Sequence, residues 1–159
     1  MFTRTHNDTG YAADGVIDAP ADRVFGALTT LDGLAGWWTP AVSGAPEAGG
    51  EITFGFDDQR IVMRVDRADD PNEVMWTCLV HDKFPDWQGT TVRFELRPVG
   101  PGSTELRFRH VGLVPVLECH GQCSRGWDHY LGSLAAYAVH GEGSPWRTAT
   151  WTRNSSLIP

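Results

Sequence analysis

One histidine lies where an ionisable ring could act inside an apolar pocket. His110 follows Leu106 and Phe108 along a run with the alternation of a β-strand, so the three side chains share one face. A histidine in such a place is commonly a core residue held by one hydrogen bond. It could equally anchor a ligand's carbonyl, hydroxyl or carboxylate, or serve as a general acid or base. The sequence leaves both interpretations open.

The segment Cys-His-Gly-Gln-Cys at 119–123 contains residue types that bind metals. Cys119 and Cys123 share one face of an expected helix, and a thiol near a helix N-terminus can become reactive through a lowered pKa. Structural zinc sites, however, need four ligands at recognisable spacing, and the chain has no second cluster. We therefore predict no metal and no other cofactor, and we expect Cys78, Cys119 and Cys123 to be reduced thiols.

Sequence motifs of the common enzyme classes are absent. The chain has no G-x-S-x-G nucleophile turn, no G-x-x-x-x-G-K phosphate loop, no H-E-x-x-H zinc motif and no dinucleotide-binding glycine pattern. Asp128 and His129 are adjacent on a helix and point in different directions, so we interpret both as surface charges rather than as an acid–base pair. No catalytic residue is assigned, and His110 is the candidate that remains.

The elements that must position these residues alternate between strands and helices. A strand is expected at Tyr11–Ala19, a helix at Ala21–Leu31 and a short helical turn at Asp32–Trp37. Strand-like runs separated by short turns then imply an antiparallel meander. They are Glu51–Phe56, Arg60–Ala68, Glu73–His81, Thr90–Arg97 and Thr104–Val111. Over Glu118–His140, apolar residues at spacings of three and four predict a long helix.

The last two of these strands predict a specific hairpin register. If Leu96 pairs with Leu106, apolar residues share one face and opposite charges meet on the other, whereas a slip by one residue would misplace both sets. The other expected pairs are Phe94–Phe108, Arg97–Glu105, Glu95–Arg107 and Arg93–Arg109. The last pair opposes like charges, which marks either a solvated face or a contact with an anion or a partner.

Five short motifs occur in an order that resembles a known superfamily. They are Ile17-Asp18-Ala19-Pro20-Ala21-Asp22-Arg23-Val24-Phe25, Gly36-Trp37-Trp38-Thr39, Gly89–Leu96, His110-Val111-Gly112-Leu113 and Gly126-Trp127. Over about residues 11–145, the chain resembles the START-related superfamily (SRPBCC) with the birch-pollen-allergen-like fold. Within it, the chain is similar to the branch named after the activator of the heat-shock-protein ATPase.

The resemblance implies an α+β helix-grip fold, in which a curved antiparallel sheet of about six or seven strands wraps around the long C-terminal helix. Two short helices follow the first strand. One domain is expected at residues 11–143, between an N-terminal segment at 1–10 and a tail at 144–159 that Trp146 and Trp151 could dock. In this fold the gap between the sheet and the long helix is the usual ligand cavity. The residues expected to line it are Trp38, Phe54, Phe56, Met63, Trp76, Phe94, Phe108, His110, Cys123, Trp127 and Leu131.

Three functions are compatible with this resemblance. The first is binding of a small hydrophobic molecule, such as a lipid, a steroid or a polyketide-like compound. The second is a cyclase, dehydratase or hydrolase that uses the same pocket with His110 as acid or base. The third is a regulator of a chaperone ATPase, or another interaction protein, that uses surface residues such as Arg93 and Arg109. A homodimer is compatible with each of them.

Composition and charge argue against several classes of partner. With 13 basic and 20 acidic side chains, the formal charge of −7 offers no general attraction to nucleic acid or to anionic lipid. The printed sequence starts without an apolar leader segment, and no stretch reaches the length of a membrane span. We therefore expect a cytoplasmic protein that inserts in no membrane and binds no nucleic acid.

Overall fold

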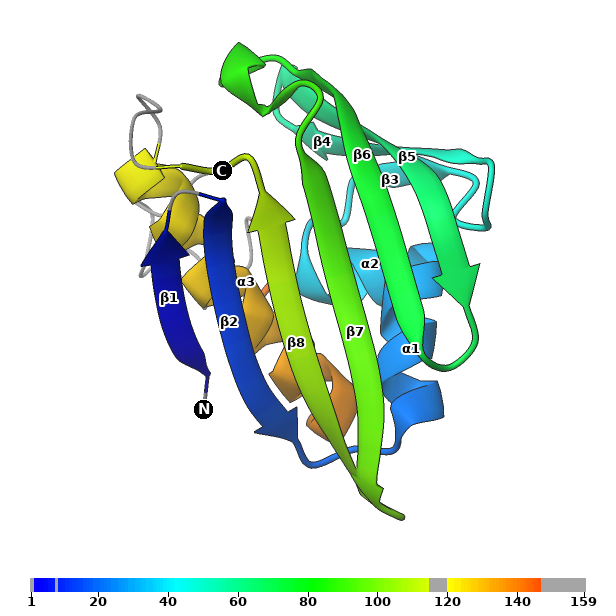
Figure 1. Cartoon of the computed structure of the whole chain (residues 1–159). Coiled ribbons are helices and arrows are strands. Elements are labelled where there is room, and N and C mark those ends of the chain that lie inside the picture. The colour runs from blue at the N-terminus through cyan, green and yellow to red at the C-terminus, as the bar shows by residue number, and fades with distance from the viewer. Residues whose placement is uncertain (1, 8, 115–119, 147–159) are drawn as a thin grey trace.

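The computed structural model describes residues 2–7, 9–114 and 120–146, which form one antiparallel sheet backed by helices. The three α-helices lie behind the same face of the sheet, and no described element covers the opposite face (Figure 1). The elements are β1 (Thr3–Asn7), β2 (Gly10–Ile17), α1 (Ala21–Thr29), α2 (Leu31–Trp37), β3 (Val42–Gly44), β4 (Glu51–Phe56), β5 (Gln59–Asp69), β6 (Glu73–His81), the 3₁₀ turn η1 (Pro85–Trp87), β7 (Thr91–Gly100), β8 (Ser103–Val111) and α3 (His120–His140). This is the α+β helix-grip arrangement that the sequence predicts.

The strand order in the sheet is β1-β2-β8-β7-β6-β5-β4-β3. From β3 to β8 each strand pairs with its neighbour in the chain, since short turns allow direct antiparallel pairing. Strand β2 instead pairs with the distant β8, and this ladder places Tyr11 opposite His110. The early and late parts of the chain therefore meet within one sheet, one strand in from the β1 edge.

The β7–β8 hairpin has the register that the sequence predicts. Leu96 lies opposite Leu106 and Phe94 opposite Phe108, and the expected charged pairs are also in register. Phe94 and Phe108 are fully buried, whereas the intervening charged residues lie on the outer face. The alternation of apolar and charged side chains, with the apolar face buried and the charged face in solvent, is therefore enough to set this register.

Two strands were missing from the sequence-based expectation. β1 lies in the N-terminal segment 1–10 and pairs with β2, and β3 pairs with β4. β1 reads Thr-Arg-Thr-His-Asn, and β3 has three residues, so neither shows the apolar alternation that marks a strand. Both are edge strands, and they bring the sheet to eight strands instead of six or seven.

A glycine allows α1 and α2 to approach closely. Thr30 lies between the two helices and caps α2, because its hydroxyl accepts a hydrogen bond from the Gly33 N–H at 3.0 Å. A Cβ atom on Gly33 would lie 2.7 Å from the Cα of Ala27 and 2.8 Å from the carbonyl oxygen of Gly26. This sharp connection turns Trp37 and Trp38 toward the sheet, and both are buried.

Helix α3 ends where the sequence predicts. Gly141 adopts a φ of +80°, which is readily accessible to glycine, and its N–H donates to the Tyr137 carbonyl at 2.8 Å. Within α3, the Ser133 hydroxyl donates to the Trp37 carbonyl at 2.8 Å. That bond joins the long helix to the end of α2.

The start of the predicted tail docks on the domain. The Ser144 N–H donates to the Ser133 hydroxyl at 2.6 Å, and the Trp146 N–H donates to the Trp38 carbonyl at 2.7 Å. The Trp146 ring also packs edge-on against Phe56, with centroids 5.5 Å apart. Trp151, Cys119 and the expected helix start at 118–119 lie outside the described residues.

We expect Gly33→Ala to lower the free energy of unfolding by about 1–3 kcal/mol, because the added methyl group would force α1 and α2 apart. Gly26→Ala is the matched control, since a Cβ there meets no described atom within 4 Å and alanine favours a helix interior by about 1 kcal/mol. Urea unfolding curves measure both values. Equal stability of the two variants would contradict the close approach at Gly33.

Candidate functional site

The residues that the sequence predicts for a pocket lie together between the sheet and the helices. None is more than 5% exposed. They are Trp38, Phe54, Phe56, Met63, Trp76, Phe94, Phe108, His110, Cys123, Trp127 and Leu131. The fold therefore brings the whole predicted set to one place, and contact of these residues with a ligand stays a prediction.

Trp38, just after α2, is at the centre of the ring contacts. Its ring centroid lies 4.3 Å from Phe54, 5.2 Å from Trp127 and 6.2 Å from Trp76. Further contacts join the remaining rings, with Trp76 5.2 Å from Phe94 and Phe94 5.1 Å from Phe108. We call Trp38, Phe54, Trp76, Phe94, Phe108 and Trp127 the aromatic layer. It forms a continuous apolar surface of aromatic rings between the sheet and α3.

His110 is the polar residue beside this layer, and both of its ring nitrogens are bonded within the protein. The Trp127 indole N–H donates to its Nδ1 at 2.9 Å. Its Nε2 lies 2.8 Å from the Thr90 hydroxyl, which itself donates to the Trp87 carbonyl at 2.6 Å. These partners assign the proton to Nε2, so His110 is a neutral ring that donates to Thr90. Full burial agrees with this, because it lowers the pKa of His110 to about 3.

The indoles of Trp38 and Trp76, both in the aromatic layer, differ in hydrogen bonding from the other tryptophans nearby. The indole of Trp37 donates to the Ala27 carbonyl at 2.8 Å, and that of Trp87 lies 3.1 Å from the Cys123 sulfur. The indole N–H groups of Trp38 and Trp76 are fully buried and have no hydrogen-bond partner among the described residues. The layer therefore contains two buried donors that remain available.

A hollow of about 290 Å³ opens where β1 and β2 face α3. We call it the seam hollow, and its walls are Phe2, Arg4, Tyr11, Asp128, Leu131 and Gly132. Leu131 belongs to the predicted pocket, and the Tyr11 ring lies 5.9 Å from Phe108 of the aromatic layer. The Tyr11 ring therefore lies between the seam hollow and the aromatic layer.

Asp128 closes the rim of the seam hollow. The Tyr11 hydroxyl and the Arg4 guanidinium both donate hydrogen bonds to its carboxylate. Burial raises the pKa of Tyr11 well above its usual range, and the neighbouring carboxylate raises it further. Asp128 is a charge at the surface, as we interpreted it, with 26% of its side chain exposed, but it is paired with Arg4 of the unforeseen strand β1. His129 is likewise half-buried, with Nε2 2.9 Å from the Ser144 carbonyl oxygen.

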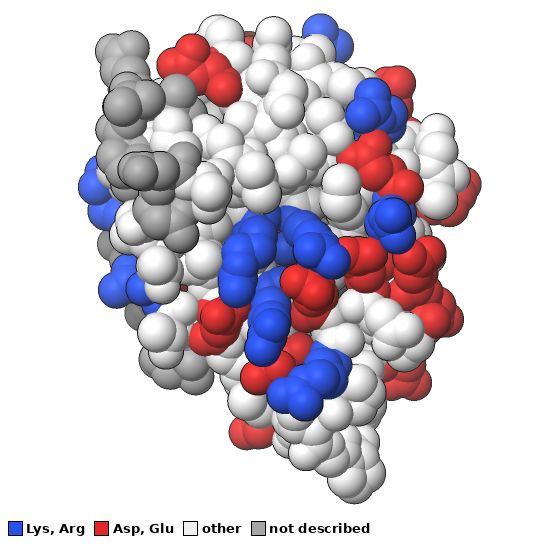
Figure 2. Space-filling view, viewed as in Figure 1, with Lys and Arg blue, Asp and Glu red and all other residues white. Residues whose placement is uncertain are grey.

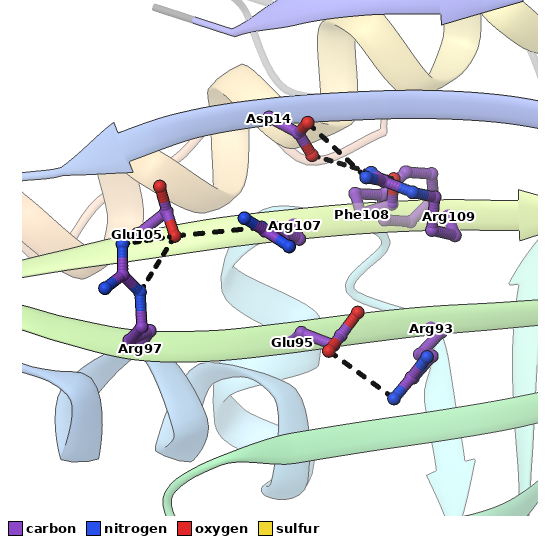
Figure 3. Close-up of polar contacts among 8 residues, drawn as sticks. All are labelled: Asp14, Arg93, Glu95, Arg97, Glu105, Arg107, Phe108 and Arg109. Atoms are coloured by element: carbon purple, nitrogen blue, oxygen red, sulfur yellow. Dashed lines mark hydrogen bonds and ion pairs between the residues drawn. The ribbon is translucent and has the colours of Figure 1, made fainter.

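The uncovered outer face of the sheet carries arginines interleaved with carboxylates (Figure 2). Arg97 and Arg107 approach Glu105 at 2.9 and 3.7 Å, and Arg93 lies 3.4 Å from Glu95 (Figure 3). These side chains surround a hollow of about 610 Å³, which we call the outer hollow. Its walls are Asn72, Glu73, Arg93, Glu95, Leu96, Arg97, Glu105 and Arg107.

Arg93 and Arg109 lie directly opposite each other, as the register predicts, but they do not form an uncompensated pair of like charges. Arg109 contacts Asp14 on β2 at 2.6 Å, and Arg93 contacts Glu73 on β6. The expectation considered the hairpin by itself, whereas the neutralising carboxylates come from the strands on either side. The outer face is a balanced lattice of charges.

No group of three or more possible metal ligands occurs among the described residues. Cys78 and Cys123 are buried, and burial raises the pKa of Cys78 to about 12, so its thiol stays protonated. Within the described part of the chain, no helix is long and apolar enough to cross a membrane.

Three residues that shape this region were missed from the sequence, Tyr11, Trp87 and Thr90, and so was the pairing of Asp128 with Tyr11 and Arg4. Trp87 and Thr90 lie in the connection between β6 and β7, which we interpreted only as turn material and as a strand start. Yet Trp87 is 1% exposed, with its ring 4.6 Å from His110. A tryptophan in a short polar turn was the available signal, since such a large ring is seldom left in solvent.

Comparisons with known proteins agree with this geometry. Residues 18–138 match the family model described as Activator of Hsp90 ATPase homolog 1-like protein. The solution structure of the Aha1 dimer from Colwellia psychrerythraea is 30% identical, covers 83% of this chain and 97% of its own, and superposes with a TM-score of 0.73. No curated protein sequence matches the chain.

Two more distant structures show the fold alone. An HSP90 activator from Plasmodium falciparum is 16% identical, covers 84% of this chain and 96% of its own, and has a TM-score of 0.69. The crystal structure of CalU16 from Micromonospora echinospora is 21% identical, covers 98% of this chain and 89% of its own, and has a TM-score of 0.66.

Two buried histidines make the stability of the fold depend on pH. Burial lowers the pKa of His110 to about 3 and that of His81 to about 4, from 6.5. Below pH 6.5 the unfolded chain takes up these protons while the folded chain stays neutral, so the free energy of unfolding falls as the pH drops toward 4 and 3. We expect a loss of about 2 kcal/mol per histidine between pH 7 and 5, measured by urea unfolding.

The control for this experiment is His81→Phe, which should lose about half as much stability as the wild type over the same pH interval. Wild-type stability that is the same at pH 7 and pH 5 would contradict the assignment of two neutral, buried imidazoles.

Proposed function

Because the chain belongs to the family of Activator of Hsp90 ATPase homolog 1-like proteins, we propose that it binds a small hydrophobic molecule. The helix-grip resemblance implies that the molecule binds between the sheet and α3. The ligand would be a lipid, a steroid or a polyketide-like compound held against the aromatic layer. The observation that carries this proposal is the seam hollow between β1, β2 and α3, whose wall residue Tyr11 packs against Phe108 of the layer.

The walls of the seam hollow suit an amphipathic molecule with a large apolar part. Phe2 and Leu131 offer apolar surface, and Gly132 leaves room because a Cβ there would meet no described atom within 4 Å. Arg4 and the Tyr11–Asp128 pair supply the polar groups of its wall. Sites of this kind bury most of a ligand against apolar side chains and orient it with few polar contacts.

The state of His110 favours ligand binding over catalysis. A general acid or base must reach the reacting group with a nitrogen that can gain or lose a proton near the working pH. Both nitrogens of His110 are engaged by Trp127 and Thr90, and burial holds its pKa at about 3. The cyclase, dehydratase or hydrolase alternative therefore lacks its expected catalytic group.

The first test is a thermal-shift screen of fatty acids, steroids and aromatic polyketides, combined with native mass spectrometry of the purified protein. A ligand that binds the native state raises its melting temperature. Absence of both a co-purified molecule and a stabilising compound would contradict the proposal.

Gly132→Phe tests the place of binding. We expect the new ring to fill the seam hollow and to weaken the affinity of any stabilising compound by about tenfold or more, which corresponds to about 1.4 kcal/mol. Gly26→Phe is the matched control, because this glycine also faces open space but lies on α1, away from the seam hollow. Calorimetric titration measures both affinities. Equal affinities of the two variants would remove the seam hollow from the site.

The outer hollow favours a second candidate function, which is pairing of two copies of the chain. Arg93, Arg97 and Arg107 face the same hollow as Glu73, Glu95 and Glu105, so one surface offers both charges, as a two-fold interface requires. The exposed arginine side chains suit bidentate contacts with carboxylates. Among the similar structures, the Colwellia protein is described as a dimer.

Size-exclusion chromatography with light scattering tests this pairing. We expect a dimer for the wild type and a monomer for the double variant Arg93→Glu/Arg107→Glu, because four carboxylates would then repel across the interface. Arg60→Glu, also exposed but outside the hollow, should leave the dimer intact. A monomeric wild type at high concentration would exclude this candidate.

A further inference from the structure

The aromatic layer holds two hydrogen-bond donors that the described fold does not use. Trp38 and Trp76 are 1% and 0% exposed, and their indole N–H groups have no partner among the described residues. Their rings are nearly parallel, with an interplanar angle of 14° and centroids 6.2 Å apart. Buried polar groups are nearly always hydrogen-bonded, since leaving one unpaired costs about 1–3 kcal/mol. Two such donors on touching rings therefore need an explanation.

The indoles of Trp127 and Trp37 and the imidazole of His110 already have partners in the protein. The Trp127 indole donates to His110, and His110 donates to Thr90. The Trp37 indole donates to the Ala27 carbonyl. An indole N–H donates and never accepts, so the available hydrogen-bonding capacity at Trp38 and Trp76 is of one kind.

We infer, on the basis of the proposed function, that the ligand carries an acceptor oxygen without a hydrogen of its own, as in a ketone, a quinone or an ester. This oxygen accepts hydrogen bonds from the indoles of Trp38 and Trp76. A carbonyl oxygen has two lone pairs and can serve both donors. A hydrocarbon of the same shape leaves both donors unpaired. A hydroxyl group brings a hydrogen of its own, which cannot bond to His110 Nδ1 because that atom already accepts from Trp127.

The experiment compares matched pairs of compounds that differ only in carbonyl oxygens. The pairs are indane and 1-indanone, fluorene and 9-fluorenone, and anthracene and 9,10-anthraquinone, which span a range of sizes. Dissociation constants are measured by quenching of tryptophan fluorescence and by calorimetry. We expect at least one ketone or quinone to bind about tenfold more tightly than its hydrocarbon, and 9-fluorenol to show less gain than 9-fluorenone.

Two variants connect the preference to these indoles. Trp38→Phe and Trp76→Phe keep an aromatic ring but remove the N–H, so each should reduce the ketone-to-hydrocarbon affinity ratio by about threefold or more. The matched control is Trp37→Phe, which removes an indole that already donates to Ala27 and should leave the ratio unchanged. The ratio is the informative readout, because a general loss of packing affects both members of a pair alike.

Each outcome has a separate meaning. If both members of every pair bind with equal affinity, the inference about the carbonyl is overturned, while binding of a hydrophobic ligand stands. If no member of any pair binds, the proposed function falls and the inference with it. The wild-type ratio needs no substitution, so it decides the question even where a tryptophan variant does not fold.

Discussion

The hydrogen-bonded line from Trp127 through His110 to Thr90 is the polar connection around which the interior is arranged. It links α3 to β8 and to the start of β7 within surroundings that are otherwise apolar. An imidazole is stable in such a place only when both nitrogens are bonded, so the helix and the two strands must keep fixed positions relative to one another. The aromatic layer packs around these hydrogen bonds, and the helices cover the layer.

The same rule separates the two kinds of polar group in the interior. Four of these groups have their hydrogen-bond partners within the protein and stabilise the fold: His110, Trp127, Trp37 and Trp87. Trp38 and Trp76 do not have partners in the described residues, although they occupy the centre of the layer. The binding function that we propose would explain this difference, because an unused donor in an apolar site is costly to the empty protein and would be satisfied by a suitable ligand.

The two faces of the sheet carry opposite chemistry for one reason, the alternation of side chains along each strand. Inward residues of β7 and β8 form the layer, and outward residues form the arginine–carboxylate lattice. The lattice neutralises itself locally through Asp14, Glu73, Glu95 and Glu105, so a chain of net charge −7 still presents arginines at its surface. Family membership is compatible with a role for either face, the inner one for small molecules and the outer one for a second chain.

Local pattern in the sequence was sufficient for the main elements, the β7–β8 register and the burial of the predicted pocket residues, because alternation and helical spacing report directly on which side chain faces the core. It was insufficient for β1 and β3, whose edge positions impose no apolar pattern. It was also insufficient for the ion-pair partners of Arg93 and Asp128. The partners of those residues come from other strands, β6 for Arg93 and β1 and β2 for Asp128. Likewise, no pattern distinguishes a tryptophan whose N–H is bonded from one whose N–H is not. Only the tertiary structure decides this, because hydrogen bonding depends on the position of a single acceptor atom, whereas burial depends on the average character of a whole face.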